Sequence, residues 1–449
     1  TGSPSATPTV TPTASATRTP TATFTPSATP FLVVTSPATA TPTPTGAAAA
    51  TATHTVTPPP TASATPIPAC AANIRKLSGV MPAFGDVAGH AFPQISPDGR
   101  QVVYVADAET DEVDQLWSAP LDGAGPPVRL SDLASGQVFW FEITPDSARV
   151  VYLAQAAASA ELYSVPVTGG ASVRLNGPLA AGGSVQDFKL SADGGWAVYW
   201  ADQDLAGVYE LYSVPAAGGA ALKLNPPLAA GQSVTEFALS ADDRVVYRAN
   251  QDSPGRVELY SVPVTGGAPT RLNGALAAGG EVDDFQVSPD AAWVVYSADQ
   301  EADDVFELYS VPGAGGAPVK LSGGLVPGGD VDNFLISADS ARVVYTADQD
   351  TDALNELYSA PLAGGPALKL NGPLGAGGFV HADFDLSADS ARVLFAAQAA
   401  GGARELYSAP LTGGPATKLS GTLAPGGSVH DFLSSPDGHA VYVADQEAP

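Results

Sequence analysis

The chain has 449 residues and a net charge of −27, from 46 acidic and 19 basic side chains, and 14% of its residues are charged. This negative charge repels phosphate backbones and anionic lipid headgroups, which argues against nucleic-acid partners and peripheral membrane binding. The single cysteine, Cys70, excludes an internal disulfide framework and a cysteine-rich metal site. No apolar run reaches the roughly 18 residues that a membrane-spanning helix needs.

Residues 1–62 form a segment made mostly of Thr, Pro, Ala and Ser, with one basic residue, Arg18, and no acidic residue. Proline fixes φ and lacks an N–H donor, so this segment is expected to be extended, as polyproline II. Its composition is typical of O-glycosylated stalks, and an unmodified linker is the alternative. The candidate glycosylation sites are Thr9, Thr11, Thr13, Thr19, Thr21, Thr25, Thr41, Thr43, Thr45 and Thr57.

Two features of this segment bear on export and assembly. The chain begins Thr1-Gly2-Ser3, as a processed export precursor would and as a partial sequence would. Phe31-Leu32-Val33-Val34 is an apolar, β-prone island that a solvated linker does not need. We therefore expect this island to pack against a folded part of the protein, either of its own chain or of a neighbouring copy.

From residue 63 to residue 449 the chain repeats. Leu-Tyr-Ser occurs six times, beginning at 162, 211, 259, 308, 357 and 406, and Leu116-Trp117-Ser118 is an earlier variant. Successive copies begin 46 to 49 residues apart. A Ser-Pro-Asp or Ser-Ala-Asp motif, once Thr-Pro-Asp, occurs eight times over the same stretch. A fixed period of this length is the mark of a repeat architecture.

Each unit contains four short β-prone runs, for example 334–336, 342–345, 356–361 and 368–370, separated by Asp-, Gly- and Pro-containing turns. Runs of this length predict antiparallel strands joined by hairpins, and no helical periodicity interrupts them. Four strands repeated about every 49 residues predict an all-β fold, a β-propeller of four-stranded blades.

The two ends of the repeat predict how the ring closes. The last unit has only two strands, around 432–434 and 441–443. Its third strand is predicted at Thr65-Pro66-Ile67-Pro68 and its fourth at Ile74-Arg75-Lys76-Leu77. Seven continuous units and one split unit make eight blades, and seven blades with frayed ends are the alternative. The split blade closes within one chain or with a neighbour, and the candidate assembly residues are Phe31, Leu32, Val33, Val34, Ile67, Ile74 and Leu77.

The first unit carries a family resemblance. Ser96-Pro97-Asp98-Gly99-Arg100, followed by Val102-Val103-Tyr104 and Leu116-Trp117-Ser118, resembles the WD40-like (PD40) repeats of TolB-type propellers. The resemblance implies a periplasmic or extracellular bacterial protein that binds partners. Similar propellers also cap prolyl-peptidase-type hydrolases, but the Gly-x-Ser-x-Gly nucleophile elbow occurs nowhere in this chain. We therefore expect a protein that is not an enzyme.

Acidic loops are the candidate metal site. Asp348, Asp350 and Asp352 alternate, and three carboxylates can converge on Ca²⁺. The spacing does not fit an EF-hand, because Ala353 stands at the sixth position and Ser359 at the twelfth. Solvated turn carboxylates are the alternative, and no cofactor is predicted.

A second acidic series lies four residues before the Ser-Asp turns, at the start of the innermost strand. These positions line the channel or, alternatively, hold buried carboxylates that fix the blade. Phe92 and Trp140 replace the acids in two units, which predicts a small-ligand site in that sector. The polar members of the series are Asp187, Glu236, Asp284, Asn333, Asp383 and Asp431.

The near-identity of the units bears on function. An active site needs different groups that converge once, whereas near-copies repeat the same groups, so the repetition favours a scaffold. We expect a secreted or cell-surface structural or adhesive propeller on its stalk, whose partner is a second copy and which forms fibres through tail-to-neighbour strand contacts. The alternative is a monomeric extracellular or periplasmic recognition propeller that binds a peptide, a protein or a glycan.

Overall fold

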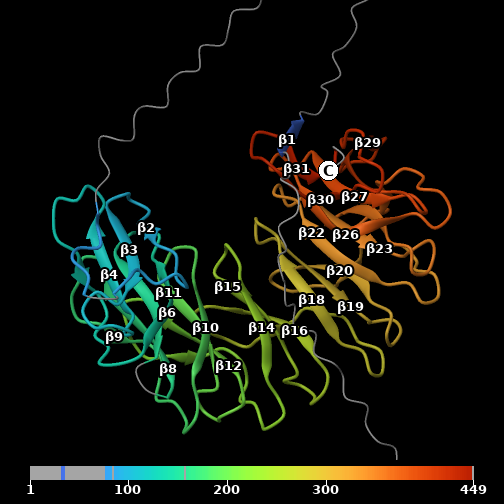
Figure 1. Cartoon of the computed structure of the whole chain (residues 1–449). Coiled ribbons are helices and arrows are strands. Elements are labelled where there is room, and N and C mark those ends of the chain that lie inside the picture. Colours follow the sequence, from blue (N-terminus) through green and yellow to red (C-terminus); the bar gives the residue numbers. More distant parts are fainter. Residues whose placement is uncertain (1–31, 36–75, 83–84, 156–157, 447–449) are drawn as a thin grey trace, which may run out of the picture.

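The computed structural model describes residues 32–35, 76–82, 85–155 and 158–446, and within them it contains strands and no helix (Figure 1). Seven sheets have four antiparallel strands that pair in chain order, and an eighth has three. The predicted all-β fold, with seven continuous units and one split unit, is confirmed.

The first four sheets span the N-terminal half of the repeat. Their strands are β2 (Gln94–Ile95), β3 (Gln101–Ala106), β4 (Gln115–Pro120) and β5 (Val128–Arg129); β6 (Gln137–Ile143), β7 (Arg149–Gln155), β8 (Ala160–Pro166) and β9 (Val173–Arg174); β10 (Val185–Leu190), β11 (Trp196–Ala201), β12 (Glu210–Pro215) and β13 (Leu222–Lys223); and β14 (Val234–Leu239), β15 (Arg244–Ala249), β16 (Glu258–Pro263) and β17 (Thr270–Arg271).

The remaining four sheets complete the array. Their strands are β18 (Val282–Val287), β19 (Trp293–Ala298), β20 (Glu307–Pro312) and β21 (Val319–Lys320); β22 (Val331–Ile336), β23 (Arg342–Ala347), β24 (Glu356–Pro361) and β25 (Leu368–Lys369); β26 (Phe379–Leu386), β27 (Arg392–Gln398), β28 (Arg404–Pro410) and β29 (Thr417–Lys418); and β1 (Leu32–Thr35), β31 (Ala440–Ala444) and β30 (Val429–Ser434), paired in that order.

The Ser-Asp motif forms the turn between the first and second strands. In the sixth sheet, Ser337 Oγ donates a hydrogen bond to Asp339 Oδ1 at 2.6 Å and accepts one from Arg342 N at 3.0 Å. The hairpin between the third and fourth strands turns at Gly364 and Gly365, whose φ angles of 92° and 139° suit glycine. Side-chain bonds and glycines thus set the turns locally, which is why the strands recur at a fixed spacing.

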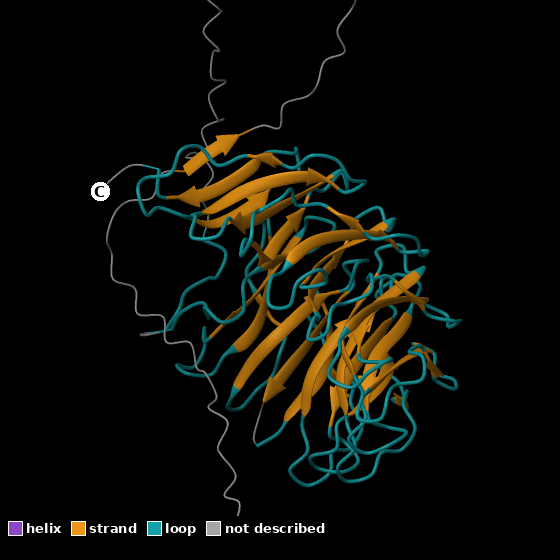
Figure 2. Cartoon of the chain, turned by 90° about the vertical axis from the view of Figure 1, so that its right-hand side faces the viewer, coloured by secondary structure: helices purple, strands orange, loops and turns teal. Residues whose placement is uncertain are grey.

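The core lies between successive sheets. Val344 and Leu357 of the sixth sheet are fully buried against Val393 and Phe395 of the seventh, and each neighbouring pair of sheets has its own cluster of this kind. Figure 1 shows the sheets in chain order along an arc, with the first sheet and β30–β31 at its two ends, and Figure 2 shows the sheets side by side from another direction. Within the described residues, no cluster joins the first sheet to the last.

The last sheet corrects one strand assignment. β1 pairs with β31 and places Val33 opposite Tyr442, so Leu32–Thr35 occupies the third-strand position that we predicted for 65–68. The physical reason is that three residues of Leu-Val-Val-Thr are β-branched and all four have backbone N–H donors, whereas Pro66 and Pro68 have none. Residues 65–68, including Ile67, lie outside the described residues, and the predicted boundary at residue 62 stays a prediction.

Candidate binding site beside Trp140

A cavity of about 420 Å³ opens between the second and third sheets. Trp140 of β6 and Leu153 of β7 form its apolar wall, and Ser184, Gln186 and Asp187, at or beside the start of β10, supply polar groups. The cavity lies in the sector where the sequence places an aromatic residue instead of an acid.

A β-bulge positions Trp140. The pairing of β6 with β7 shifts register between Val138 and Trp140, and β10 shifts in the same way between Val185 and Asp187. An extra residue of this kind redirects the side chain that follows it. Trp140 keeps 43% of its surface exposed, and Phe92, at the corresponding position of the first sheet, keeps 79%. The bulge therefore presents an aromatic face to solvent in this sector.

The polar members of the same series are exposed or half-buried rather than deeply buried. Glu236 pairs with Arg248 at 3.2 Å, Asp383 pairs with Arg404, and Asn333 Nδ2 donates to the carbonyl of Ala382. The other three carboxylates accept a hydrogen bond from the next residue's N–H, and they are Asp187, Asp284 and Asp431. The series thus fixes its own strands or the next sheet while it keeps a negative inner surface.

Glu142 adds a titratable group next to the cavity. Burial raises the pKa of its carboxyl. The backbone N–H of Leu190 donates a hydrogen bond to Glu142 Oε2 at 3.3 Å, and this bond opposes the shift. With Asp187 close by, the cavity combines an indole face with acceptors and a negative potential. Such a site suits a ligand that stacks on an aromatic ring and donates hydrogen bonds, and it repels anions.

The structure directs the three acidic-loop residues to different partners. Asp348 accepts the N–H groups of Asp330 at 2.5 Å and Ala353 at 2.8 Å, and Asp350 pairs with Lys369 at 3.2 Å. Asp352 is exposed. Over the residues that the structure describes, no group of three or more His, Cys, Asp or Glu side chains is arranged to hold a metal ion.

The predicted assembly residues divide into two groups. Leu32, Val33 and Val34 lie in β1, and Leu77 is partly buried against the first sheet. Phe31, Ile67, Ile74, Cys70 and all ten candidate threonines lie outside the described residues.

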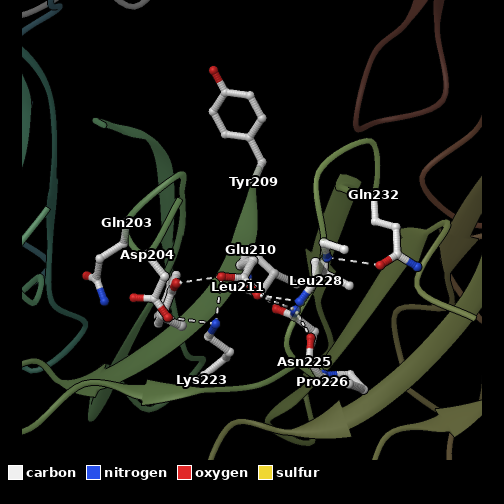
Figure 3. A network of polar contacts seen from close by, with 12 residues as sticks. Gln203, Asp204, Tyr209, Glu210, Leu211, Lys223, Asn225, Pro226, Leu228 and Gln232 are labelled. Atoms are coloured by element: carbon white, nitrogen blue, oxygen red, sulfur yellow. Dashed lines mark hydrogen bonds and ion pairs between the residues drawn. The ribbon is translucent and has the colours of Figure 1, made fainter. Parts of the chain in front are cut away.

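A buried ionic network of the third and fourth strands was not predicted (Figure 3). Glu210 accepts hydrogen bonds from Tyr212 Oη at 3.0 Å, Lys223 Nζ at 2.6 Å and Leu228 N at 3.0 Å. Lys223 also pairs with Asp204 at 2.7 Å, and burial raises the pKa of the Tyr212 phenol. A Glu followed 13 residues later by Lys or Arg is the sequence signal, which recurs as Glu161/Arg174, Glu258/Arg271, Glu307/Lys320, Glu356/Lys369 and Glu405/Lys418.

No family model matches the chain, and no curated protein matches it in sequence. Among solved structures it is similar to a TolB from Agrobacterium tumefaciens, at 18% identity over 51% of this chain and 78% of that one, with a TM-score of 0.31. An oligogalacturonate lyase in complex with manganese matches at 14% identity over 71% and 87%, with a TM-score of 0.38.

A dipeptidyl peptidase 4 from Porphyromonas gingivalis matches at 13% identity, covering 73% of this chain and 52% of that one, with a TM-score of 0.50. Together with the repeated four-stranded sheets, this likeness decides the fold. The chain is a β-propeller. At these identities the likeness concerns the fold alone.

The comparisons contradict one expectation. We expected a protein that is not an enzyme, yet the dipeptidyl peptidase 4 that shares this fold is an enzyme. That expectation is therefore wrong, because the lack of a nucleophile elbow excludes one hydrolase type only. Separately, the described residues contain no helix long and apolar enough to cross a membrane.

Proposed function

We propose that this β-propeller is a secreted or cell-surface structural or adhesive protein whose copies join head to tail through the last sheet, carried on an O-glycosylated Thr/Pro stalk. The observation that supports assembly is the incomplete sheet β1-β31-β30, which ends the array with three strands. A three-stranded sheet leaves an unpaired strand edge and an uncovered face, and both favour association.

The outer face of this sheet is apolar and partly open. Val441 and Val443 are partly exposed, whereas Val344 and Thr346, at the same positions of β23, are fully buried by the next sheet. Leu433 of β30 keeps 54% of its surface exposed. The last sheet thus carries the face that every inner sheet uses to hold its successor.

Head-to-tail contact follows from the difference between the two ends. The last sheet exposes the face on which each inner sheet packs with the following sheet, and the first sheet carries the face on which each inner sheet packs with the preceding one. The two surfaces of the contact are therefore different. A heterologous contact of this kind need not close and generates open filaments. Strand addition supplies main-chain hydrogen bonds without demanding a particular side-chain sequence.

Val441→Asp tests the assembly. Wild-type protein should form oligomers whose size grows with concentration in multi-angle light scattering, and Val441→Asp should be monomeric because it places a charge in an apolar interface. Leu205→Asp is the matched control, since Leu205 is 46% exposed in a loop and should leave assembly unchanged. Wild-type protein that stays monomeric at every concentration contradicts the proposal.

The stalk is a separate part of the proposal and has its own measurement. Residues 1–62 carry many threonines spaced by proline and no acidic residue, a composition that keeps hydroxyls exposed to modification. The intact mass of native material should exceed the 45.1 kDa of the sequence if the threonines carry sugars. A mass equal to that of the sequence contradicts glycosylation and leaves a plain linker.

A second candidate function is recognition of a peptide, a protein or a glycan by a monomeric propeller outside the cytoplasm. The cavity beside Trp140 favours it, because an exposed indole with nearby hydrogen-bonding groups occurs in one sector of an otherwise repetitive surface. A strictly monomeric wild-type protein in the scattering experiment would leave this function in place of assembly.

A further inference from the structure

A four-residue motif with the sequence of a fourth strand lies before the first sheet, and not after the last sheet, which lacks a fourth strand within the described residues. Lys76-Leu77-Ser78-Gly79 precedes the first sheet, and the same four residue types occur at 320–323 and 418–421. Those two copies follow the third strands of the fifth and seventh sheets and form the end of each sheet. The sequence of 76–79 is therefore that of a fourth-strand end.

The internal copies define what this motif does. Lys418 lies opposite Tyr407 in the strand pairing, and Leu419 N donates to Leu406 O at 2.8 Å. Ser420 Oγ accepts a hydrogen bond from Leu406 N at 3.2 Å. Leu419 also packs against the cluster that contains Tyr442 of the following sheet. The motif thus closes one sheet and covers the next.

Residues 76–82 keep only the second of these contacts. Leu77 and Met81 pack against the cluster that contains Tyr104 and Trp117 of the first sheet, as Leu419 packs against the cluster that contains Tyr442. None of residues 76–82 pairs with a strand that would precede the first sheet. The motif therefore packs on the first sheet as its internal copies pack on the following sheet, but it is not paired as the fourth strand of a preceding sheet.

The sheet that lacks a fourth strand lies at the opposite end of the same chain. β1-β31-β30 stops at its third strand, and in Figure 1 it lies apart from the first sheet. The two incomplete parts match, because one has a fourth-strand end without a sheet and the other has a sheet without a fourth strand.

We propose that Lys76–Gly79 of one copy forms the fourth strand of the β1-β31-β30 sheet of a second copy. This inference rests on the proposed head-to-tail function and specifies its contact. Register follows from the internal sheets, in which Tyr407 lies opposite both Phe395 and Lys418. Val33 lies opposite Tyr442, which corresponds to Phe395, so Lys76 is placed opposite Val33.

The same register fixes the main-chain bonds and the packing. Leu77 N donates to Leu32 O, and Ser78 Oγ accepts from Leu32 N, as Leu419 and Ser420 do with Leu406. The first sheet of the copy that donates Lys76–Gly79 then covers the partly exposed Val441 and Val443 of the second copy. One contact therefore completes the strand order and buries the open face.

Engineered cysteines test this register in the full-length chain. In a Cys70→Ser background, one copy carries Val33→Cys and a second, differently tagged copy carries Lys76→Cys. Cysteines opposite each other in adjacent strands are close enough to bridge. We expect a mixed disulfide-linked dimer after mild oxidation. Replacing Lys76→Cys by Val80→Cys should give none, because Val80 lies outside the four-residue strand and is 93% exposed.

The outcomes separate this inference from the proposed function. Wild-type assembly in light scattering without the 33–76 disulfide overturns the inference and leaves assembly intact. A wild-type protein that does not assemble overturns both. A chain that carries both cysteines and forms the disulfide only within itself also overturns the inference, because the sheet then closes inside one copy. A dimer equally abundant with Val80→Cys shows that the register is wrong.

Discussion

The sixth sheet and the last sheet are built from the same motif but differ in what covers them. β23 and β31 both follow a Ser-Asp turn, and each pairs with a first strand on one side and a third strand on the other. In the sixth sheet Val344 is fully buried and Leu335 half-buried, whereas their counterparts in the last sheet, Val441 and Leu433, are partly and largely exposed. Local sequence therefore sets the strands, and the neighbouring sheet supplies the burial.

The turns show the same dependence on a neighbour. Asp339 N donates to Ser390 Oγ of the next sheet's turn at 2.9 Å, and Asp290 N donates to Ser340 Oγ at 3.0 Å. Asp437, in the last turn, has no following sheet within the described part of the chain. These two inner turns are thus linked to their successors, and the final turn is not.

The largest expected effect is a difference in the free energy of unfolding between replacing a buried leucine and replacing an exposed one. Leu357→Ala should lower the free energy of unfolding by about 2–5 kcal/mol, because it leaves a cavity between packed sheets. Leu433→Ala should change it by less than about 0.5 kcal/mol. Urea denaturation of both variants, made in the Val441→Asp background so that oligomers do not contribute, measures the difference.

Equal losses for the two leucines would contradict the comparison. They would mean that Leu433 is buried within a single chain, so that the last sheet packs on the first without a second copy. A small loss for Leu357→Ala would instead mean that the inner sheets do not depend on their neighbours for stability.

Most of the fold could be predicted from sequence because its signals are local. The hydroxyl of Ser337 bonds to residues two and five positions away, and Gly364 and Gly365 supply the positive φ of the hairpin. Leu357 and Tyr358 mark the third strand. Interactions of this range recur with the motif, so the period alone locates the strands of the seven complete sheets.

The split sheet could not be predicted in full because its third strand is set by competition. Two segments, 32–35 and 65–68, are candidates for the strand that pairs with the edge of β31, which lies roughly 400 residues further along the chain. Alignment to the repeat favoured the proline-rich segment. The Trp140 sector was predicted from a break in the acidic series, but the cavity depends on the bulges in β6 and β10. The Glu210–Lys223 pair was missed because partners on different strands leave only a spacing.

A smaller effect should distinguish the turns by pH. The hydroxyl of Ser337, with help from Ala341 N and Ser390, holds the pKa of Asp339 below its ordinary 3.8. A carboxyl whose pKa is lowered on folding stabilises the protein above its ordinary pKa, and this contribution is lost as the pH falls through the folded value. Asp339→Asn should therefore destabilise the protein at neutral pH by about 0.5–1.5 kcal/mol, at the lower end because the carboxylate is exposed.

The same replacement in the last turn should have less effect. The pKa of Asp437 is also lowered, first by Ser435, but no serine from a following sheet contributes. Urea midpoints of Asp339→Asn, Asp437→Asn and the parent at neutral pH and near pH 3 test both points. The difference in urea midpoint between Asp339→Asn and its parent should become smaller at the lower pH, where the parent's carboxyl is becoming protonated. A gap that stays constant would show that Asp339 acts by shape rather than by charge, and a larger gap for Asp437→Asn would show that the link between turns adds nothing.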